Sequence, residues 1–141
     1  MRGPSGNSRP CSVAGDDLLF VYGTLMRGFR LHALLEGRAT YLTEATTPGL
    51  LFDLGSYPAA LKSATGKIRG EVYRLADPGL WRALDSAEGS QYHREQAGIE
   101  QASGGRVGAY VYWYVGPLDG AVPIPGGDYR AHAPVRSIHH R

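Results

Sequence analysis

The sequence predicts an α+β fold, in which six or seven short strands and two short helices in mixed order close as a small β-barrel. Three observations support this prediction. Short apolar runs recur between glycine- and proline-rich turns, the segment 106–115 alternates in side-chain character, and Asp77-Pro78 opens a helical pattern. At 141 residues the chain fits one domain that can bury a sizeable core.

Composition divides the chain into three segments. Residues 1–16 are Gly, Pro, Ser, Asn and Arg with almost nothing to bury, which predicts a flexible leader. Residues 17–117 form the expected domain, and residues 118–141 a Pro/Gly-rich C-terminal extension. The single cysteine, Cys11, cannot form an internal disulfide, so the chain is compatible with a reducing compartment and a cytoplasmic location is expected.

Charge and hydropathy disfavour several classes of partner. The formal net charge of +2 is small and its cations are scattered, so no nucleic acid is expected. The longest apolar run, Leu18–Val21, is too short to cross a bilayer, and residues 1–17 lack the apolar segment of a secretory signal, so no membrane is expected. The five histidines show no metal-ligand spacing, so no metal is expected.

The first element is the apolar run 18–25, which stops abruptly at Gly23-Thr24. It predicts a buried strand that ends in a tight loop. Such a loop leaves backbone amides without ladder partners, and Gly23 has no side chain to keep a ligand away from them. Convergent amides suit a carboxylate or a developing oxyanion, although a strand followed by Gly-Thr is more often only a turn.

The next segments alternate between turns and strands. In 26–37, three leucines at helical spacing before Gly37 predict a short helix or helical turn. The expected strands that follow are 39–47, 50–54, 57–61 and 67–75. In 67–75, Ile68, Gly70 and Val72 share one face, and Arg69, Glu71 and Tyr73 share the other, which predicts a half-buried strand.

A helix should begin at Asp77-Pro78, where the aspartate can cap free amides and proline fits the first helical position. Its apolar residues include Leu80 and Leu84, and one further turn brings Glu88 onto the same side.

Gly89 marks a plausible helix end and places Glu88 in the last turn. Burial and the negative end of the helix dipole would both raise the pKa of this carboxyl, and a glutamate lifted toward neutrality can act as a general acid/base. A frayed helix end with Glu88 in water is the alternative, and the pattern alone does not decide between them.

Strands are expected at 92–101 and 106–115, joined by a turn at Gly104-Gly105. In the second strand the two faces differ. One carries Val107, Ala109, Val111, Trp113 and Val115, and the other carries Gly108, Tyr110, Tyr112 and Tyr114. A tyrosine stripe is usually a core wall or the lip of a cavity, and stacking on nucleic-acid bases is disfavoured because basic neighbours are lacking.

Four motifs in order carry a family resemblance. They are Val21-Tyr22-Gly23-Thr24-Leu25-Met26-Arg27-Gly28, Pro48-Gly49-Leu50-Leu51-Phe52-Asp53-Leu54-Gly55-Ser56-Tyr57-Pro58-Ala59, Gly70-Glu71-Val72-Tyr73-Arg74-Leu75, and Leu84-Asp85-Ser86-Ala87-Glu88-Gly89-Ser90-Gln91-Tyr92-His93-Arg94. The chain from about Leu19 to Val115 resembles the γ-glutamylcyclotransferase-like proteins, which include γ-glutamylamine cyclotransferases and plant avirulence-induced proteins. Each motif is weak alone, but the ordered set is specific.

The resemblance implies a mixed barrel with flanking helices and a cavity at one end. It implies that Tyr22, Gly23, Thr24 and Leu25 form a substrate-binding loop facing Glu88 as general acid/base. The family's activity is release of 5-oxoproline from a γ-glutamyl compound, by attack of the α-amine on the γ-carbonyl. That reaction needs neither metal nor cofactor.

Further candidates for the pocket are Tyr57, Tyr92 and Tyr112, the last because it lies mid-strand on the tyrosine face, although all three fit a plain cavity wall equally well. Three other carboxylates, Asp53, Glu71 and Asp85, are expected to be solvated or paired instead of catalytic.

Two functions are open at this point. The first is a cyclotransferase acting on a small-molecule γ-glutamyl amine or peptide. The second is a non-catalytic small-molecule-binding or regulatory protein that keeps the same fold and pocket. Retention of both the loop and Glu88 favours the enzyme. The sequence predicts neither the leaving amine nor the oligomeric state.

Overall fold

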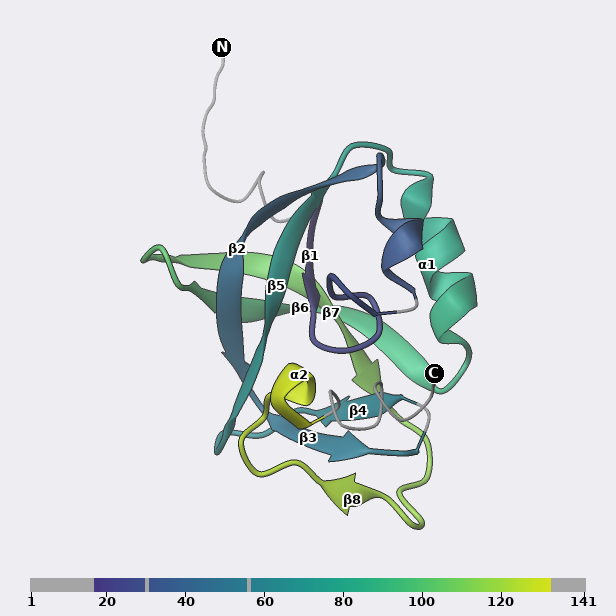
Figure 1. The fold of residues 1–141 in the computed structure, drawn as a ribbon, viewed down its shortest axis with the longest axis vertical. Coiled ribbons are helices and arrows are strands. Elements are labelled where there is room, and N and C mark those ends of the chain that lie inside the picture. The colour runs from purple at the N-terminus through teal and green to yellow at the C-terminus, as the bar shows by residue number, and fades with distance from the viewer. Residues whose placement is uncertain (1–16, 30, 56, 133–141) are drawn as a thin grey trace.

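The computed structural model describes residues 17–29, 31–55 and 57–132 (Figure 1). Cys11, the rest of the expected leader and the segment 133–141 lie outside the described residues. Five strands form a closed barrel in the order β1 (Leu18–Val21), β5 (Lys67–Leu75), β2 (Ala39–Pro48), β6 (Tyr92–Gln101) and β7 (Arg106–Tyr114). A second sheet has the order β4 (Pro58–Leu61), β3 (Leu50–Asp53) and β8 (Val122–Pro123).

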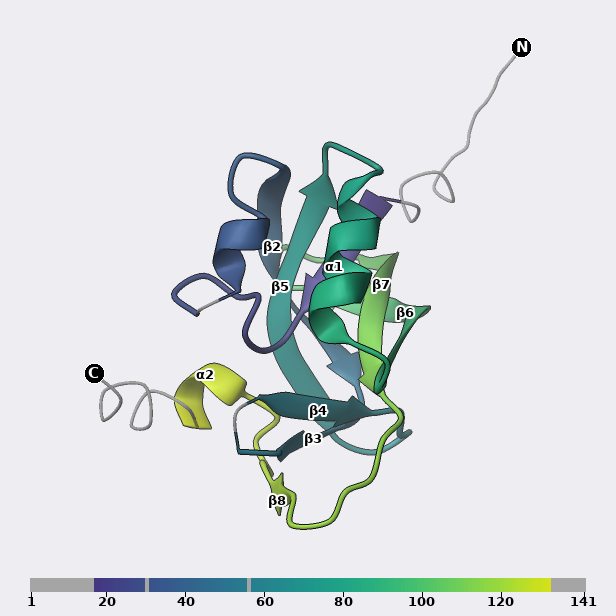
Figure 2. The same ribbon diagram turned by 90° about the vertical axis from the view of Figure 1, so that its right-hand side faces the viewer.

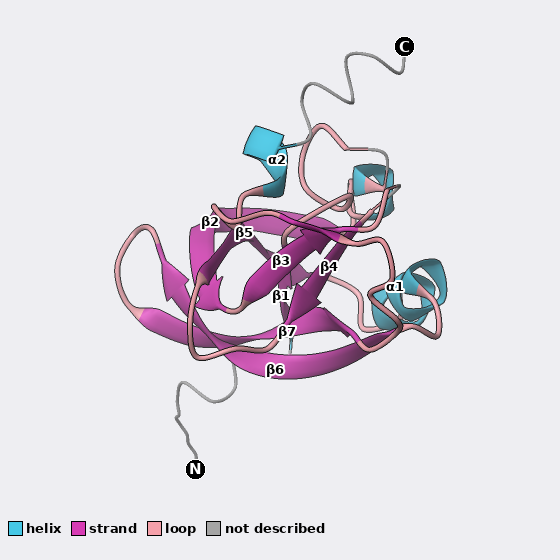
Figure 3. Cartoon of the chain, turned by 90° about the horizontal axis from the view of Figure 1, so that it is seen from below, coloured by secondary structure: helices cyan, strands magenta, loops and turns pink. Residues whose placement is uncertain are grey.

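The predicted α+β barrel is confirmed, and its strands are mixed in direction. Four of the barrel's neighbouring pairs are antiparallel, and the parallel pair of β1 with β7, with Leu19 opposite Tyr110, closes the cylinder. All four residues of β1 are buried, which explains its unbroken apolar sequence. The second sheet lies across one end of the barrel, as the view from below shows (Figure 3).

In the described residues, three short helical segments flank the strands. They are the 3-10 helix η2 (His32–Leu34), α1 (Leu80–Glu88) and α2 (Tyr129–His132). The predicted helical turn in 26–37 is thus present as a run of turns containing η2, and Gly37, with φ of 76°, ends it. Helix α1 runs alongside the barrel (Figure 2). Its residues Leu80 and Leu84 are fully buried.

The prediction for 67–75 holds for the buried face of Ile68, Gly70 and Val72 and for the exposed Arg69, but it is wrong for Glu71 and Tyr73. Glu71 and Tyr73, expected on the solvent face of β5, are 2% and 3% exposed. Glu71 is covered by the segment after β1 and by α2, since Arg27 and Arg130 both bond to it, and the Tyr73 ring packs against those of His32 and Tyr41. Periodicity within one strand cannot reveal a cover supplied by other parts of the chain.

The strand predicted over 106–115 ends one residue early, because Val115 lies beyond β7 and is 63% exposed. Its tyrosine face packs on α1: the Tyr110 ring lies 5.1 Å from that of Trp81, and the Tyr112 hydroxyl bonds to Asp85. Tyr110 and Tyr112 are therefore part of the wall between barrel and helix, whereas Tyr114 packs against Tyr92 and donates to Pro117 O.

Residues 118–132 pack onto the domain. Strand β8 pairs with β3, and Ile124 and Tyr129 join the buried core. Helix α2 is held to β3 by a 2.8 Å bond between His132 Nε2 and Asp53 Oδ2. The described residues contain no helix long and apolar enough to span a membrane.

Candidate functional site

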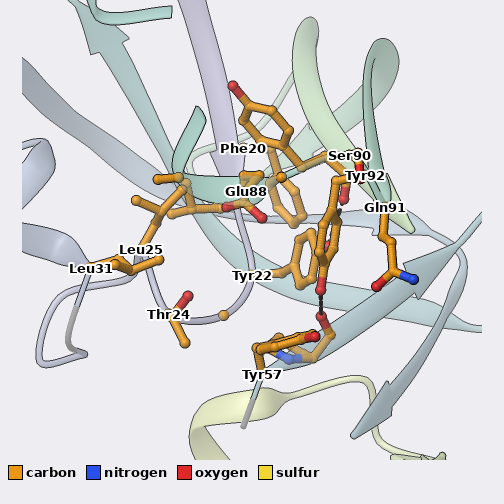
Figure 4. Close-up of a pocket in the computed structure, with 16 residues that line it drawn as sticks. Phe20, Tyr22, Thr24, Leu25, Leu31, Tyr57, Glu88, Ser90, Gln91 and Tyr92 are labelled. Atoms are coloured by element: carbon orange, nitrogen blue, oxygen red, sulfur yellow. Dashed lines mark hydrogen bonds between the residues drawn. The ribbon is translucent and has the colours of Figure 1, made fainter. Parts of the chain in front are cut away.

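A cavity of about 400 Å³ opens between the end of β1, the C-terminal end of α1 and the start of β4. It is lined by all eight residues singled out in the sequence: Tyr22, Gly23, Thr24, Leu25, Tyr57, Glu88, Tyr92 and Tyr112. Ten of its lining residues are labelled in Figure 4. The barrel therefore brings together segments that lie far apart in the sequence.

The loop after β1 is folded by its own carbonyl groups. Met26 N–H donates to Gly23 O at 2.9 Å, and Leu31 N–H donates to Thr24 O at 2.9 Å. The carbonyl of Leu25 accepts from His32 Nδ1 at 3.0 Å. In the described part of the chain, these bonds use carbonyl oxygens of the loop as acceptors. They do not use the amides of Gly23, Thr24 and Leu25, which an anion-binding turn needs as donors.

Gly23 is required for a reason that the sequence does not show. A Cβ placed on it would lie 2.3 Å from Pro58 Cγ, so only glycine lets β4 approach the loop this closely. Its φ is not in the left-handed region. Close approach of Pro58, and not access for a ligand alone, thus fixes the residue at this position.

Glu88 is the last residue of α1, and the helix ends at Gly89, whose φ is 91°. Leu80 and Leu84 are the buried residues of the helix, and Glu88 lies one turn after Leu84 on the same side. Its side chain is half-buried and points into the cavity (Figure 4). The fully solvated, frayed end considered from the sequence is not what the structure shows. The raised pKa expected for Glu88 stays a prediction.

Three tyrosine hydroxyls of the cavity, those of Tyr22, Tyr92 and Tyr112, donate hydrogen bonds to neighbouring elements. Tyr22 donates to Tyr112 O at 2.5 Å, and Tyr92 donates to Pro58 O at 2.7 Å. Tyr112 donates to Asp85 Oδ1 at 2.6 Å. Tyr57 meets the Tyr92 ring edge-on, with centroids 6.2 Å apart. These rings build an aromatic wall of the cavity, to which Tyr22 contributes from the loop itself.

Burial raises the pKa of Tyr22 and Tyr92 well above the ordinary value of 10.0, and the negative charge of Glu88 raises both further. Burial also raises the pKa of Tyr112, with the hydrogen bond to Asp85 adding to the shift. All three phenols are therefore neutral donors over the whole physiological pH range.

These shifts predict the protein's behaviour in alkali. Above pH 10 the unfolded chain releases tyrosine protons that the folded chain retains, so the free energy of unfolding should fall as pH rises. We expect the absorbance of these tyrosinates at 295 nm to appear in one step together with loss of the near-ultraviolet circular dichroism. Gradual ionisation of all nine tyrosines in an intact fold would contradict this expectation.

The three other carboxylates are each paired. Asp53 bonds His132 and the amide of Gly55, and Glu71 bonds two arginines. Asp85 forms a two-pronged pair with Arg94, at 2.9 and 3.0 Å. None of these three carboxylates is among the residues that line the cavity. Their bonds hold neighbouring elements together, in line with the expectation that they are solvated or paired.

Several lining residues escaped the sequence reasoning: Phe20, Val21, Leu31, Pro58, Ala87, Gly89, Ser90 and Gln91. Ser90 and Gln91 directly follow the helix end, so they could have been found by extending the Glu88 motif to Tyr92. Phe20 and Leu31 could not be predicted, because the sequence does not distinguish an apolar side chain in the core from one that lines a cavity.

Metal ligands do not gather at this cavity. Within 17–29, 31–55 and 57–132, no three or more His, Cys, Asp or Glu side chains lie close enough together to hold a metal ion.

A family model described as "Gamma-glutamyl cyclotransferase, AIG2-like" matches residues 19–131. A curated relative, "Putative gamma-glutamylcyclotransferase YkqA" of Bacillus subtilis (strain 168), is 29% identical over 119 residues, covering 83% of this chain. The chain spans only 42% of the length of that relative.

Solved structures share the fold. The crystal structure of YkqA gives a TM-score of 0.71 at 29% identity, over 86% of this chain and 42% of that one. The uncharacterized protein PH0828 of Pyrococcus horikoshii gives 0.68 at 27% identity, over 88% and 96%. An AIG2-like protein of Mus musculus gives 0.64 at 26% identity, over 73% and 80%.

Proposed function

Because the chain belongs to the family of gamma-glutamyl cyclotransferase, AIG2-like proteins, we propose that it releases 5-oxoproline and a free amine from a small γ-glutamyl amine or peptide. One observation carries the proposal. The half-buried carboxylate of Glu88 lines the same cavity as the loop Tyr22–Leu25. A volume of about 400 Å³ suits a ligand of this size.

The proposed reaction is an intramolecular acyl transfer. The α-ammonium of the glutamyl group gives a proton to Glu88, and its nitrogen then attacks the γ-carbonyl carbon to form a C–N bond within a five-membered ring. The tetrahedral intermediate collapses, the bond to the leaving nitrogen breaks, and Glu88 returns the proton to that nitrogen. The ring nitrogen releases a second proton to water, which leaves the neutral N–H of 5-oxoproline. A single carboxylate can serve both transfers, and no redox change occurs.

We assign to the loop the binding of the substrate's negative charge. Amides of Gly23, Thr24 or Leu25 would donate to the α-carboxylate, or to the oxyanion that forms on the γ-carbonyl. A well-placed donor to an oxyanion contributes roughly 3 kcal/mol to transition-state stabilisation. Holding the amine against the carbonyl within one folded substrate adds the large advantage of intramolecular geometry.

We assign two roles to the aromatic wall: it gives the cavity its shape and it excludes water from the bound substrate. Tyr22, Tyr92 and Tyr112 are protonated and bonded to neighbouring elements, so they present ring surface and fixed dipoles to the ligand. A dry, rigid wall strengthens the electrostatic interactions of the loop with developing charge. The reaction as proposed needs no cofactor, and a cytoplasmic location stays a prediction.

The proposal is tested with the purified full chain, a panel of γ-glutamyl amines and peptides, and detection of 5-oxoproline. Formation of 5-oxoproline together with an equal amount of free amine supports the enzyme. Saturable binding of panel members without turnover would instead support the non-catalytic binding protein, and neither binding nor turnover across a broad panel would overturn both functions.

A further inference from the structure

Three charged side chains behind the candidate site form a cluster that the proposed chemistry does not use. The carboxylate of Glu71, on β5, is 3% exposed and accepts from two arginines. Arg27 Nε lies 3.2 Å from Glu71 Oε2, and Arg130 Nη2 lies 2.8 Å from the same oxygen. We call Glu71, Arg27 and Arg130 the loop clamp.

The clamp also forms hydrogen bonds to the backbone of Arg27. The amide of Arg27 donates to Glu71 Oε1 at 3.1 Å, and Tyr73 Oη donates to the same oxygen at 3.0 Å. The second prong of the Arg130 guanidinium, Nη1, donates to the carbonyl of Arg27 at 2.8 Å. Both backbone polar groups of Arg27 are thereby fixed from outside the loop.

Arg27 comes two residues after Leu25, which lines the cavity, so the clamp holds the far side of the substrate loop. Aromatic contacts reinforce it: the Arg130 guanidinium lies 5.3 Å from the Phe29 ring centre, and the Phe29 and Tyr129 rings are 5.5 Å apart. Helix α2, which carries Arg130 and Tyr129, is in turn tied to β3 through His132 and Asp53.

Pairing is energetically required at this position. A buried carboxylate without partners is strongly unfavourable, and charge-assisted bonds from arginine forks are among the stronger hydrogen bonds in proteins. The bond to Glu71 raises the pKa of Arg27, so this partner keeps its charge. The three groups therefore stabilise one position of the loop relative to β5 and α2.

We propose that Glu71 and Arg130 are positioning residues, which set the geometry of the loop Tyr22–Leu25 and make ligand binding at the cavity depend on helix α2. They act through Arg27 and touch no reacting atom. The part of this inference that concerns catalysis rests on the proposed function, whereas the part that concerns loop order does not.

The test compares Arg130→Met with the unmodified protein by amide hydrogen exchange. We expect exchange in residues 22–29 to accelerate about tenfold, while β6 and β7 keep their protection. Arg38→Met is the matched control, because Arg38 has a similar side-chain exposure, 43% against 45%, and pairs with the exposed Asp77 instead. Unchanged exchange in 22–29 would overturn the clamp.

Steady-state kinetics on a γ-glutamyl substrate give the second readout. Arg130→Met should lower kcat/KM about tenfold, mainly through KM, because the loop binds the substrate before and during the reaction. Arg130→Lys should recover only part of this loss, since one ammonium cannot replace the two prongs on Glu71 and Arg27. A loss of thermal stability with kcat/KM unchanged would mean that the clamp is structural only.

The two proposals fail in different ways. If the unmodified protein forms no 5-oxoproline and the loop of Arg130→Met still exchanges faster, the cyclotransferase is wrong and the clamp stands. If the unmodified protein is active and Arg130→Met matches it in both exchange and kinetics, the clamp is wrong and the cyclotransferase stands.

Discussion

Replacement of Glu88 by glutamine should lower kcat for 5-oxoproline formation by about 10²- to 10⁴-fold, the usual range for loss of a general acid/base. Glutamine has nearly the same shape and stays in the last turn of α1, but it can neither take the proton of the α-ammonium nor return it to the leaving nitrogen. The KM should change little, because the loop and the aromatic wall are intact. The measurement is initial rate against substrate concentration.

Glu36→Gln is the matched control for this experiment, because it removes the charge of an exposed glutamate outside the cavity lining. It should leave kcat unchanged. The Glu88→Gln protein should retain its near-ultraviolet circular dichroism, since Leu80 and Leu84 anchor the helix. A Glu88→Gln protein that turns over at the unmodified rate would refute the role given to Glu88.

The second large effect is expected from Gly23→Ala. The new Cβ would lie 2.3 Å from Pro58 Cγ and 2.9 Å from Pro58 Cδ, so either the loop or the start of β4 must move. Overpacking of this kind costs about 1–3 kcal/mol in the free energy of unfolding. A loop displaced by about 1 Å can lose on the order of 10²-fold in kcat/KM. Chemical denaturation and steady-state kinetics measure the two losses separately.

A double-mutant cycle with Pro58→Ala tests the stated cause. If the clash is with the proline ring, the combined Gly23→Ala and Pro58→Ala protein should recover part of the stability lost in Gly23→Ala alone. Gly108→Ala serves as the control, because no atom lies within 4 Å of the added Cβ and its φ is not positive. Equal losses from Gly23→Ala and Gly108→Ala would exclude the clash as the cause.

The structure also shows side-chain contacts that the pattern within a single strand could not predict. Glu71 illustrates the point, because the alternation in 67–75 assigned it to a solvent-facing row. The arginines that bury it come from the turn after β1 and from α2, at opposite ends of the described chain. No pattern local to β5 contains that information. The expectation that Glu71 is solvated or paired was nevertheless compatible with this outcome.

The aromatic residues show the same limit at the candidate site. Tyr22, Tyr57, Tyr92 and Tyr112 all line the cavity, but only the fold shows where their hydroxyls are used. Tyr112 donates to Asp85 on α1, and Tyr92 donates to Pro58 on β4. These bonds join segments that lie far apart in the sequence, so no local pattern predicts them.

The sequence by itself determined the elements whose cause is local. The unbroken apolar run of β1, the presence of a helix in the segment after Asp77, its end at Gly89 and the turns at glycine and proline follow from side-chain periodicity and backbone preference. The helix start was placed too early, because α1 begins at Leu80 and not at Pro78. The ordered motifs also determined the family. Only the tertiary structure decided that Pro58 restricts residue 23 to glycine and that Arg27 and Arg130 bury Glu71. Those relations depend on contacts across the barrel, where the position of each side chain is fixed by packing and not by its sequence neighbours.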